Sequence, residues 1–295
     1  MSGAMSGAMS GAAPPPDSVA FCADLVRSHD FPRYAASLFA PAAERRALLA
    51  LHAFNVEIVR VRDQVSQPLP GEIRLQWWTD MLSGHAHGSA EGNPVAAELL
   101  RAIRDFGLPV EPLSLLADEH QFDLYNDPMP TMAALEGYLD ATSSALYVLA
   151  AQIMGASAET VSHVARHAGL ACGIVQVIAS LPRDAAHRQL FLPQQVLARH
   201  GCAMDDVFAG KPTPALDAVL DQLLGEAREH AATAVSLLAE LPAAVRPAFL
   251  PLSEARATIG RLARPGRNPF IPLQPSRLRT LWTLWRASRS PAFTT

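Results

Sequence analysis

The sequence predicts one all-α domain, a helical bundle around a central cavity, spanning residues 17–295. Three observations support this prediction. Residues that favour helices, chiefly Ala, Leu, Arg, Glu and Gln, dominate almost everywhere after Pro16. Prolines recur at intervals typical of helix boundaries, and no alternation of β-branched residues is long enough to predict a strand. The chain has 295 residues, 49% of them hydrophobic, so it can bury a sizeable core.

Proline marks the boundaries of the first six expected helices. Pro32 separates the first two, because proline disrupts a helix interior. Pro41 and Pro94 open later helices, since proline fits the first turn. The segment Pro68-Leu-Pro-Gly71 is expected to be a loop. The expected helices in this part cover 18–29, 33–39, 42–65, 72–82, 94–105 and 109–125.

Capping residues, glycine and proline mark the remaining helices. Thr131 is expected to cap a long helix that ends near Met154. Pro182 is expected to end the next helix, and Gly201 to cap the end of the short one that follows it. The expected helices in this part cover 131–154, 158–181, 191–200, 214–239, 242–262 and 276–288.

Composition excludes several classes of protein. A net charge of −4, without a Lys/Arg tract, argues against nucleic-acid binding. The three cysteines are widely separated and form no CxxC pair, which favours reduced thiols in a cytoplasmic protein. No segment reaches about 18 consecutive apolar residues, so no membrane-spanning helix is expected. Residues 1–16, three Met-Ser-Gly-Ala units followed by Ala-Pro-Pro-Pro, lack the features of a secretion signal and are expected to be disordered.

Two helical segments each carry one aspartate where a pair would bind metal. Two carboxylates four residues apart on one helix face can jointly hold a magnesium ion and, through it, a diphosphate. Asp63 and Asp184 are present, but Val59 and Ser180 stand four residues before them. Each segment therefore retains half of such a pair. From spacing alone, Asp63 can instead form a salt bridge with Arg60.

The second of these segments has a face of small and polar residues on an otherwise apolar helix. This face indicates either close packing against a neighbouring helix or the lining of a cavity, and spacing alone leaves both open. Its members are Gly169, Gly173, Gln176, Ser180 and Asp184.

Two further clusters have two interpretations each. An acidic cluster at Asp118, Glu119, His120 and Asp123 could bind a cation, but a solvated helix end is favoured. The expected last helix is basic, aromatic and amphipathic, with Trp282 and Trp285 among its arginines. That pattern suits a membrane surface or a partner's groove, although packing in the bundle with an arginine-rich outer face is the simpler interpretation.

Five blocks of sequence occur in an order and spacing that resemble a known family. They are Arg45 to Phe54, Gln76-Trp-Trp, Phe122-Asp-Leu124, Ala171 to Arg183 and Phe191-Leu-Pro193. Over residues 18–289 the chain resembles the squalene/phytoene synthase family. The resemblance implies an all-α isoprenoid-synthase fold, in which two aspartate-rich helices face each other and bind magnesium and a prenyl diphosphate.

The chain departs from this family's aspartate motifs. The first motif expects acids at positions 59, 60 and 63, where Val59, Arg60 and Asp63 stand. The second has Ser180 in place of an acid and keeps Asp184. Ionising a prenyl diphosphate depends on electrostatic stabilisation of the leaving group, so normal condensation is not expected. The segments 69–78 and 180–183 resemble the branch that includes a mitochondrial assembly factor for respiratory complex I.

Two functions follow from the resemblance. The first is a non-catalytic protein without a cofactor, which acts in complex I assembly or as an accessory protein that binds an isoprenoid or lipid. Its partners would be a complex I subunit or assembly protein and the membrane surface, and its location cytoplasmic or at the inner face of the membrane. The alternative is a prenyl-diphosphate transferase that uses Asp63 and Asp184 as residual magnesium ligands. The candidate contacts to a cavity or diphosphate are Arg60, Gln176, Ser180, Arg183 and Arg188.

The interior of the bundle would separate these hypotheses. An apolar tunnel behind Asp63 and Asp184 would favour a bound lipid or isoprenoid. Large side chains filling that space would instead favour a third interpretation, an adaptor protein that holds no ligand.

Overall fold

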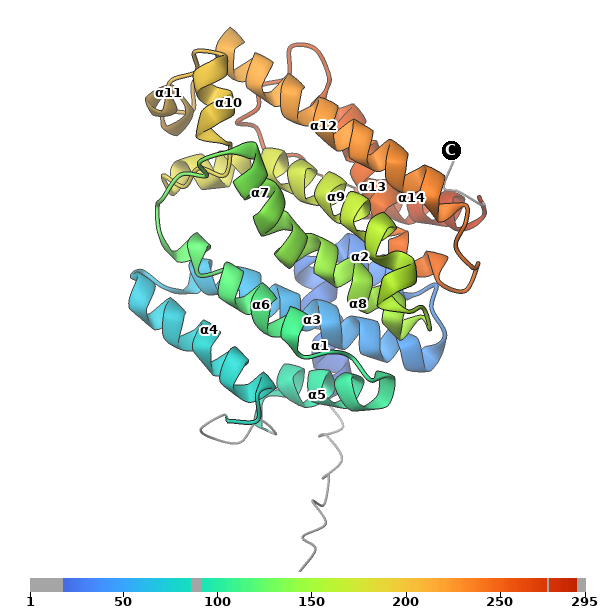
Figure 1. Ribbon diagram of the computed structural model, residues 1–295. Coiled ribbons are helices and arrows are strands. Elements are labelled where there is room, and N and C mark those ends of the chain that lie inside the picture. The colour runs from blue at the N-terminus through green and yellow to red at the C-terminus, as the bar shows by residue number, and fades with distance from the viewer. Residues whose placement is uncertain (1–17, 86–91, 275, 291–295) are drawn as a thin grey trace, which may run out of the picture.

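A computed structural model describes residues 18–85, 92–274 and 276–290. Within these ranges every regular element is helical, which confirms the predicted all-α class (Figure 1). The N-terminal segment expected to be disordered, residues 1–16, lies outside the described residues.

Fourteen α-helices lie within the described residues. They are α1 (Ser18–His29), α2 (Phe31–Ser37), α3 (Ala42–Gln64), α4 (Pro68–Leu82), α5 (Pro94–Phe106), α6 (Glu111–Glu119), α7 (Met132–Leu139), α8 (Ala145–Ile153), α9 (Ala158–Ala186), α10 (Gln194–Arg199), α11 (Met204–Phe208), α12 (Pro214–Leu238), α13 (Pro251–Leu262) and α14 (Arg277–Ser288). The described residues also form the 3₁₀ turns η2 (Phe122–Leu124) and η4 (Arg246–Phe249) and the π-helical turn η3 (Asp140–Ser144).

Several predicted boundaries were wrong. Pro68 opens α4 instead of lying in a loop, because proline is tolerated in the first turn of a helix. The sixth helix ends at Glu119, and α13 begins only at Pro251. Pro182 lies inside α9, which continues to Ala186. Proline removes one backbone donor, and the packing of this long helix outweighs that loss.

Helices α3 and α9 form the centre of the bundle (Figure 1). Helix α3 packs against α1, α4, α5 and α8, and α9 packs against α8, α12 and α13. Among the described helices, α9 alone is long and apolar enough to cross a membrane, but two thirds of its most apolar stretch is buried in the bundle. It is therefore a core helix of the bundle.

Two glycines let α9 approach the end of α7 and the turn η3 closely. A Cβ atom on Gly169 would lie 2.4 Å from the Cα of Ser144, and one on Gly173 would lie 2.5 Å from the Cδ2 of Leu139. The hydroxyl of Ser143 donates a hydrogen bond to the carbonyl of Gly169 at 2.9 Å. Of the two interpretations of this face, close packing is therefore correct for Gly169 and Gly173.

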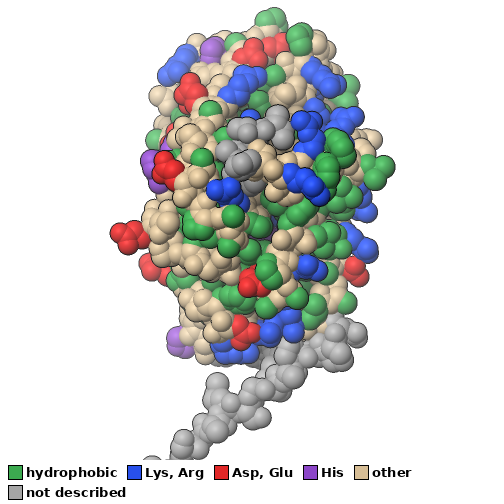
Figure 2. Space-filling model, turned by 90° about the vertical axis from the view of Figure 1, so that its right-hand side faces the viewer, with side chains coloured by type: hydrophobic (Ala, Val, Ile, Leu, Met, Phe, Trp, Pro, Cys, Tyr) green, Lys and Arg blue, Asp and Glu red, His purple; other side chains and the backbone are tan. Residues whose placement is uncertain are grey.

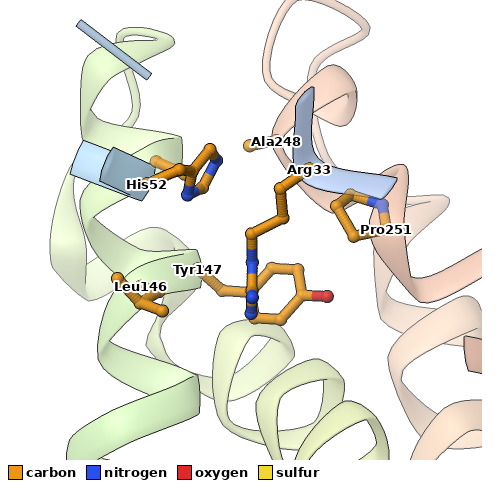
Figure 3. A pocket seen from close by; sticks show the side chains of 7 residues that line it. Arg33, His52, Leu146, Tyr147, Ala248 and Pro251 are labelled. Carbon is orange, nitrogen blue, oxygen red and sulfur yellow. The ribbon is translucent and has the colours of Figure 1, made fainter. Parts of the chain in front are cut away.

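A small pocket lies at the junction of α2, α3 and α8 (Figure 3). Arg33 extends from α2 toward the ring of Tyr147, and His52 lines the same pocket from α3. The pocket has a volume of about 10 Å³, room for roughly one water molecule. This pocket is too small for a lipid chain.

An ion pair anchors Arg33 in this position. Its Nη1 donates to Oδ2 of Asp30 at 2.7 Å, and the two side chains are only 19% and 18% exposed. Burial alone would raise the pKa of Asp30, but Arg33 holds it below its usual value. Burial and then the Arg33 cation lower the pKa of His52 to about 3, so this imidazole is neutral.

Candidate functional site

The two aspartates of the incomplete motifs meet at the ends of α3 and α9, with one arginine between them. Asp63 lies in the last turn of α3, and Arg183 and Asp184 lie in the last turn of α9. The Nη1 of Arg183 is 3.8 Å from Oδ2 of Asp63, and its Nη2 is 3.1 Å from Oδ1 of Asp184. A single guanidinium thus bridges the two carboxylates. The salt bridge between Asp63 and Arg60, an alternative from spacing, does not form.

The two carboxylates have different environments. The Asp63 side chain is 46% exposed, whereas that of Asp184 is 6% exposed. Burial, with a smaller contribution from the neighbouring Asp123, raises the pKa of Asp184 to about 6 against the opposing effect of Arg183. At neutral pH the ionised Asp184 therefore destabilises the folded protein.

Asp123 is a third carboxylate of the site, and its predicted environment was wrong. It lies in η2 and is buried, not at a solvated helix end as predicted. Its Oδ1 accepts a hydrogen bond from the hydroxyl of Tyr138 at 2.8 Å, and burial raises its pKa. The side-chain amide of Gln189 donates a hydrogen bond to the backbone carbonyl of Asp123 at 3.0 Å. The sequence did point to Asp123, because it lies in the block Phe122-Asp-Leu124, one of the five blocks that carry the family resemblance.

The other predicted contact residues form no hydrogen bond or ion pair with the two aspartates within the described part of the chain. Gln176 donates to the hydroxyl of Ser180 at 2.9 Å on an outer part of α9. Arg60 is half-buried and has no ion-pair partner among the residues that the structure describes. Arg188, at a positive φ of 55°, places its guanidinium 4.7 Å from the ring centre of Phe208 in α11. Only Arg183 of the five candidates contacts both aspartates.

A surface pocket of about 190 Å³ lies beside the end of α3. Arg62 lines it and donates to the side-chain oxygen of Asn126 at 3.3 Å. The buried Nε of Arg62 has no hydrogen-bond partner within the described part of the chain. The other residues of this pocket are Ser66, Gln67, Pro68, Leu124 and Tyr125. Guanidinium and amide groups make it suited to an anionic or polar ligand.

The arrangement of the acidic residues at this site does not suit magnesium binding. Across the described ranges, no three His, Cys, Asp or Glu side chains come together in a way that could hold a metal ion. Magnesium requires near-octahedral oxygen ligands. Here the oxygens of Asp63 and Asp184 face a guanidinium, which is the group that a dication would have to displace.

Replacing Asp184 with Asn should stabilise the protein at neutral pH but not in acid. The pKa of Asp184 is about 6 in the folded chain, above its usual value. Folding therefore favours the protonated carboxyl group, which is fully present near pH 4, and the protein loses this stability as the pH rises through 6. The side-chain amide of the variant cannot ionise. The free energy of unfolding of the variant should exceed that of the wild type by about 2 kcal/mol at pH 7.5 and should equal it near pH 4. Urea unfolding at both pH values measures the difference.

Asp63→Asn is the matched control, because the Asp63 carboxylate is half exposed and pairs with the same arginine. It should change stability by less than about 0.5 kcal/mol. An Asp184→Asn variant that is less stable than the wild type at both pH values would show that the ion pair with Arg183 outweighs burial.

Comparison with known proteins gives one family. The family model for squalene/phytoene synthase matches residues 26–286. The chain is 31% identical over 257 residues to NADH dehydrogenase (ubiquinone) complex I, assembly factor 6, of Rattus norvegicus, covering 87% of this chain and 77% of that protein. It is 25% identical over 210 residues to a presqualene diphosphate synthase of Rhodopseudomonas palustris, covering 71% of this chain and 75% of that protein.

Solved structures agree on the fold. The squalene synthase HpnC from Alicyclobacillus acidocaldarius superposes with a TM-score of 0.73 at 21% identity, covering 86% of this chain and 95% of that one. A dehydrosqualene synthase superposes with a TM-score of 0.75 at 14% identity, covering 91% and 95%. The bundle therefore has the isoprenoid-synthase fold, and the chain belongs to the squalene/phytoene synthase family.

Proposed function

We propose that this chain is a non-catalytic member of its family that takes part in the assembly of respiratory complex I. Its relationship to complex I assembly factor 6 over 87% of its length supports the role in assembly. The observation that carries the non-catalytic part is the Arg183 guanidinium, which bridges Asp63 and Asp184. In this role the protein acts at the cytoplasmic side of the membrane that holds complex I.

The chemistry of the family reaction explains why this bridge matters. Ionisation of a prenyl diphosphate needs strong positive charge on the leaving group, which divalent ions supply. Val59, Arg60 and Ser180 offer no carboxylate where the family pattern has one, and Arg183 pairs with the two that remain. Arg62 and Arg183 can hold an anion by charge-assisted hydrogen bonds, but binding alone does not ionise it.

The packing around Arg33 favours an adaptor over a lipid carrier. A prenyl or acyl chain needs an apolar cavity of several hundred Å³. The pocket between Arg33, His52 and Tyr147 has about 10 Å³. Contacts to a complex I subunit or assembly partner are therefore proposed for the outer surface, and an isoprenoid ligand would have to bind elsewhere.

The alternative function is a prenyl-diphosphate transferase with Asp63 and Asp184 as magnesium ligands. Its support is the likeness to presqualene diphosphate synthases and the convergence of the two aspartates. The buried Asp184, whose pKa is raised to about 6, also has the character of a functional carboxylate, since such groups often lower stability. For this function, Arg183 must move away from both carboxylates.

An Asp63→Asn/Asp184→Asn double variant separates the two functions. In the organism of origin, the gene is deleted and replaced by the wild type or the variant. The adaptor role predicts that deletion lowers assembled complex I severalfold, and that wild type and variant restore it equally. Blue-native gels and NADH–ubiquinone oxidoreductase activity of membranes measure the result.

The same two purified proteins are incubated with farnesyl or geranylgeranyl diphosphate and magnesium, and diphosphate release is measured. Neither should release diphosphate above background. Release by the wild type that the variant loses would establish the transferase instead. Normal complex I in the deletion strain would refute the assembly role.

A further inference from the structure

Helix α14 carries two apolar stripes on opposite sides. The inner stripe, Thr280, Leu284 and Ala287, is buried, and the helix packs there against α2 and α13. The outer stripe consists of Leu278, Leu281, Trp282 and Trp285, at the spacing of one helix face. These four side chains are 78%, 38%, 58% and 40% exposed. Within the described residues, the bundle packs on the inner stripe only and leaves the outer one exposed.

The outer stripe is a contiguous patch, unlike the single apolar residues scattered on most surfaces. The rings of Trp282 and Trp285 stack on each other, with centroids 5.1 Å apart. Contiguous exposed apolar surface bordered by polar groups marks interaction sites, whereas isolated exposed residues need no explanation. The partner of this stripe must therefore offer an apolar layer.

Positive charge surrounds the stripe. The segment 264–290 contains six arginines and no Asp or Glu, whereas the rest of the chain has 28 acidic and 18 basic side chains. On α14, Arg279 and Arg286 are exposed beside the stripe, and the guanidinium of Arg289 lies 4.7 Å from the ring centre of Trp285. Figure 2 views the molecule from the side on which α14 lies in Figure 1, and basic side chains lie there among hydrophobic ones.

We propose that the outer face of α14 docks on an anionic lipid bilayer, with the helix lying in the plane of the surface. Tryptophan favours the headgroup level, where its ring is apolar and its N–H can bond to polar groups. Arginine reaches back to lipid phosphates while its methylenes stay in the apolar layer. The absence of acidic residues from this segment removes repulsion from the lipid charge. This inference is independent of the proposed role in assembly.

Vesicle co-sedimentation of the full-length protein tests the proposal. The vesicles are phosphatidylcholine, alone or with about 30% phosphatidylglycerol. The wild type should bind the anionic vesicles at least tenfold more tightly than the neutral ones. Trp282→Ala/Trp285→Ala should weaken binding to the anionic vesicles at least tenfold, and Arg279→Gln/Arg286→Gln about fivefold per arginine.

The matched control is Leu69→Ala/Ile73→Ala, another exposed apolar pair, 63% and 62% exposed on α4. It should bind vesicles like the wild type, and a similar loss would refute the assignment to α14. Brominated lipids should quench fluorescence of the wild type but not of the double tryptophan variant, in which only Trp77 and Trp78 of the four tryptophans remain.

Three results would overturn the proposal. The wild type could fail to bind either vesicle, which would assign the stripe to a protein groove. It could bind both compositions equally, which would remove the role of the arginines. It could be a dimer in sedimentation velocity that Trp282→Ala/Trp285→Ala converts to a monomer, which would assign the stripe to a second copy. Circular dichroism of each variant verifies that it is folded.

Discussion

Gly169→Ala should lower the free energy of unfolding by about 3 kcal/mol, because the new methyl group has no space. Its Cβ would lie 2.4 Å from both the Cα and the hydroxyl oxygen of Ser144. Backbone cannot move aside as a side chain can, so α9 must shift away from η3 and weaken the hydrogen bond from Ser143 to the Gly169 carbonyl. The melting temperature should fall by roughly 6 to 10 °C, measured by calorimetry.

Two other glycines provide controls for Gly169→Ala. Gly225 lies inside α12, where an added Cβ would meet no atom of a neighbouring element within 4 Å, so Gly225→Ala should stabilise the protein by about 0.5 to 1 kcal/mol. Gly173→Ala should cost about 1 kcal/mol, because the nearest atoms belong to the movable side chain of Leu139. Equal effects at Gly169 and Gly225 would contradict the close contact between α9 and η3.

Arg33→Ala should destabilise the protein by about 3 kcal/mol or more. The change leaves the mostly buried carboxylate of Asp30 without its cation, at the start of α2. Asp30→Asn/Arg33→Met, which removes both charges and keeps most of the volume, should recover most of the loss. Urea unfolding at neutral pH gives the free energies of the wild type and both variants.

Arg27→Ala is the matched control for Arg33→Ala. Arg27 pairs with Asp24 at 2.9 Å with the same three-residue spacing, but the two side chains are 51% and 67% exposed. Water screens this pair, so its loss should cost less than about 0.5 kcal/mol. A similar small cost at Arg33, or no recovery in the double variant, would show that the central ion pair is not what stabilises this junction.

Local features of the sequence were sufficient for the fold class and for most helices. Helix propensity and the positions of proline act within a few residues, so Pro41 and Thr131 were placed correctly. Pro182 was misjudged for the opposite reason. Its cost is local, but the packing that outweighs it comes from helices distant in the sequence. The order of the five sequence blocks identified the family because that order survives where single residues change.

The candidate site was predicted only in part. Asp63 and Asp184 were found because the spacing of carboxylates on a helix is visible in the sequence. The bridge through Arg183 was not, since Asp63 and Arg183 are 120 positions apart and spacing offered Arg60 as the nearer partner. Asp123 was assigned to solvent, because burial of a short turn depends on what packs over it.

For this protein, local sequence specifies an all-α chain, the faces of its helices and two incomplete aspartate motifs. The packing of α3 against its neighbours and of α9 within the bundle specifies the rest. It directs Arg183 between the two aspartates and Arg33 into the pocket beside Tyr147. It also buries one stripe of α14 and leaves the other exposed. The physical reason is that propensity and periodicity act over one or two turns, whereas burial and ion pairing depend on distances between helices.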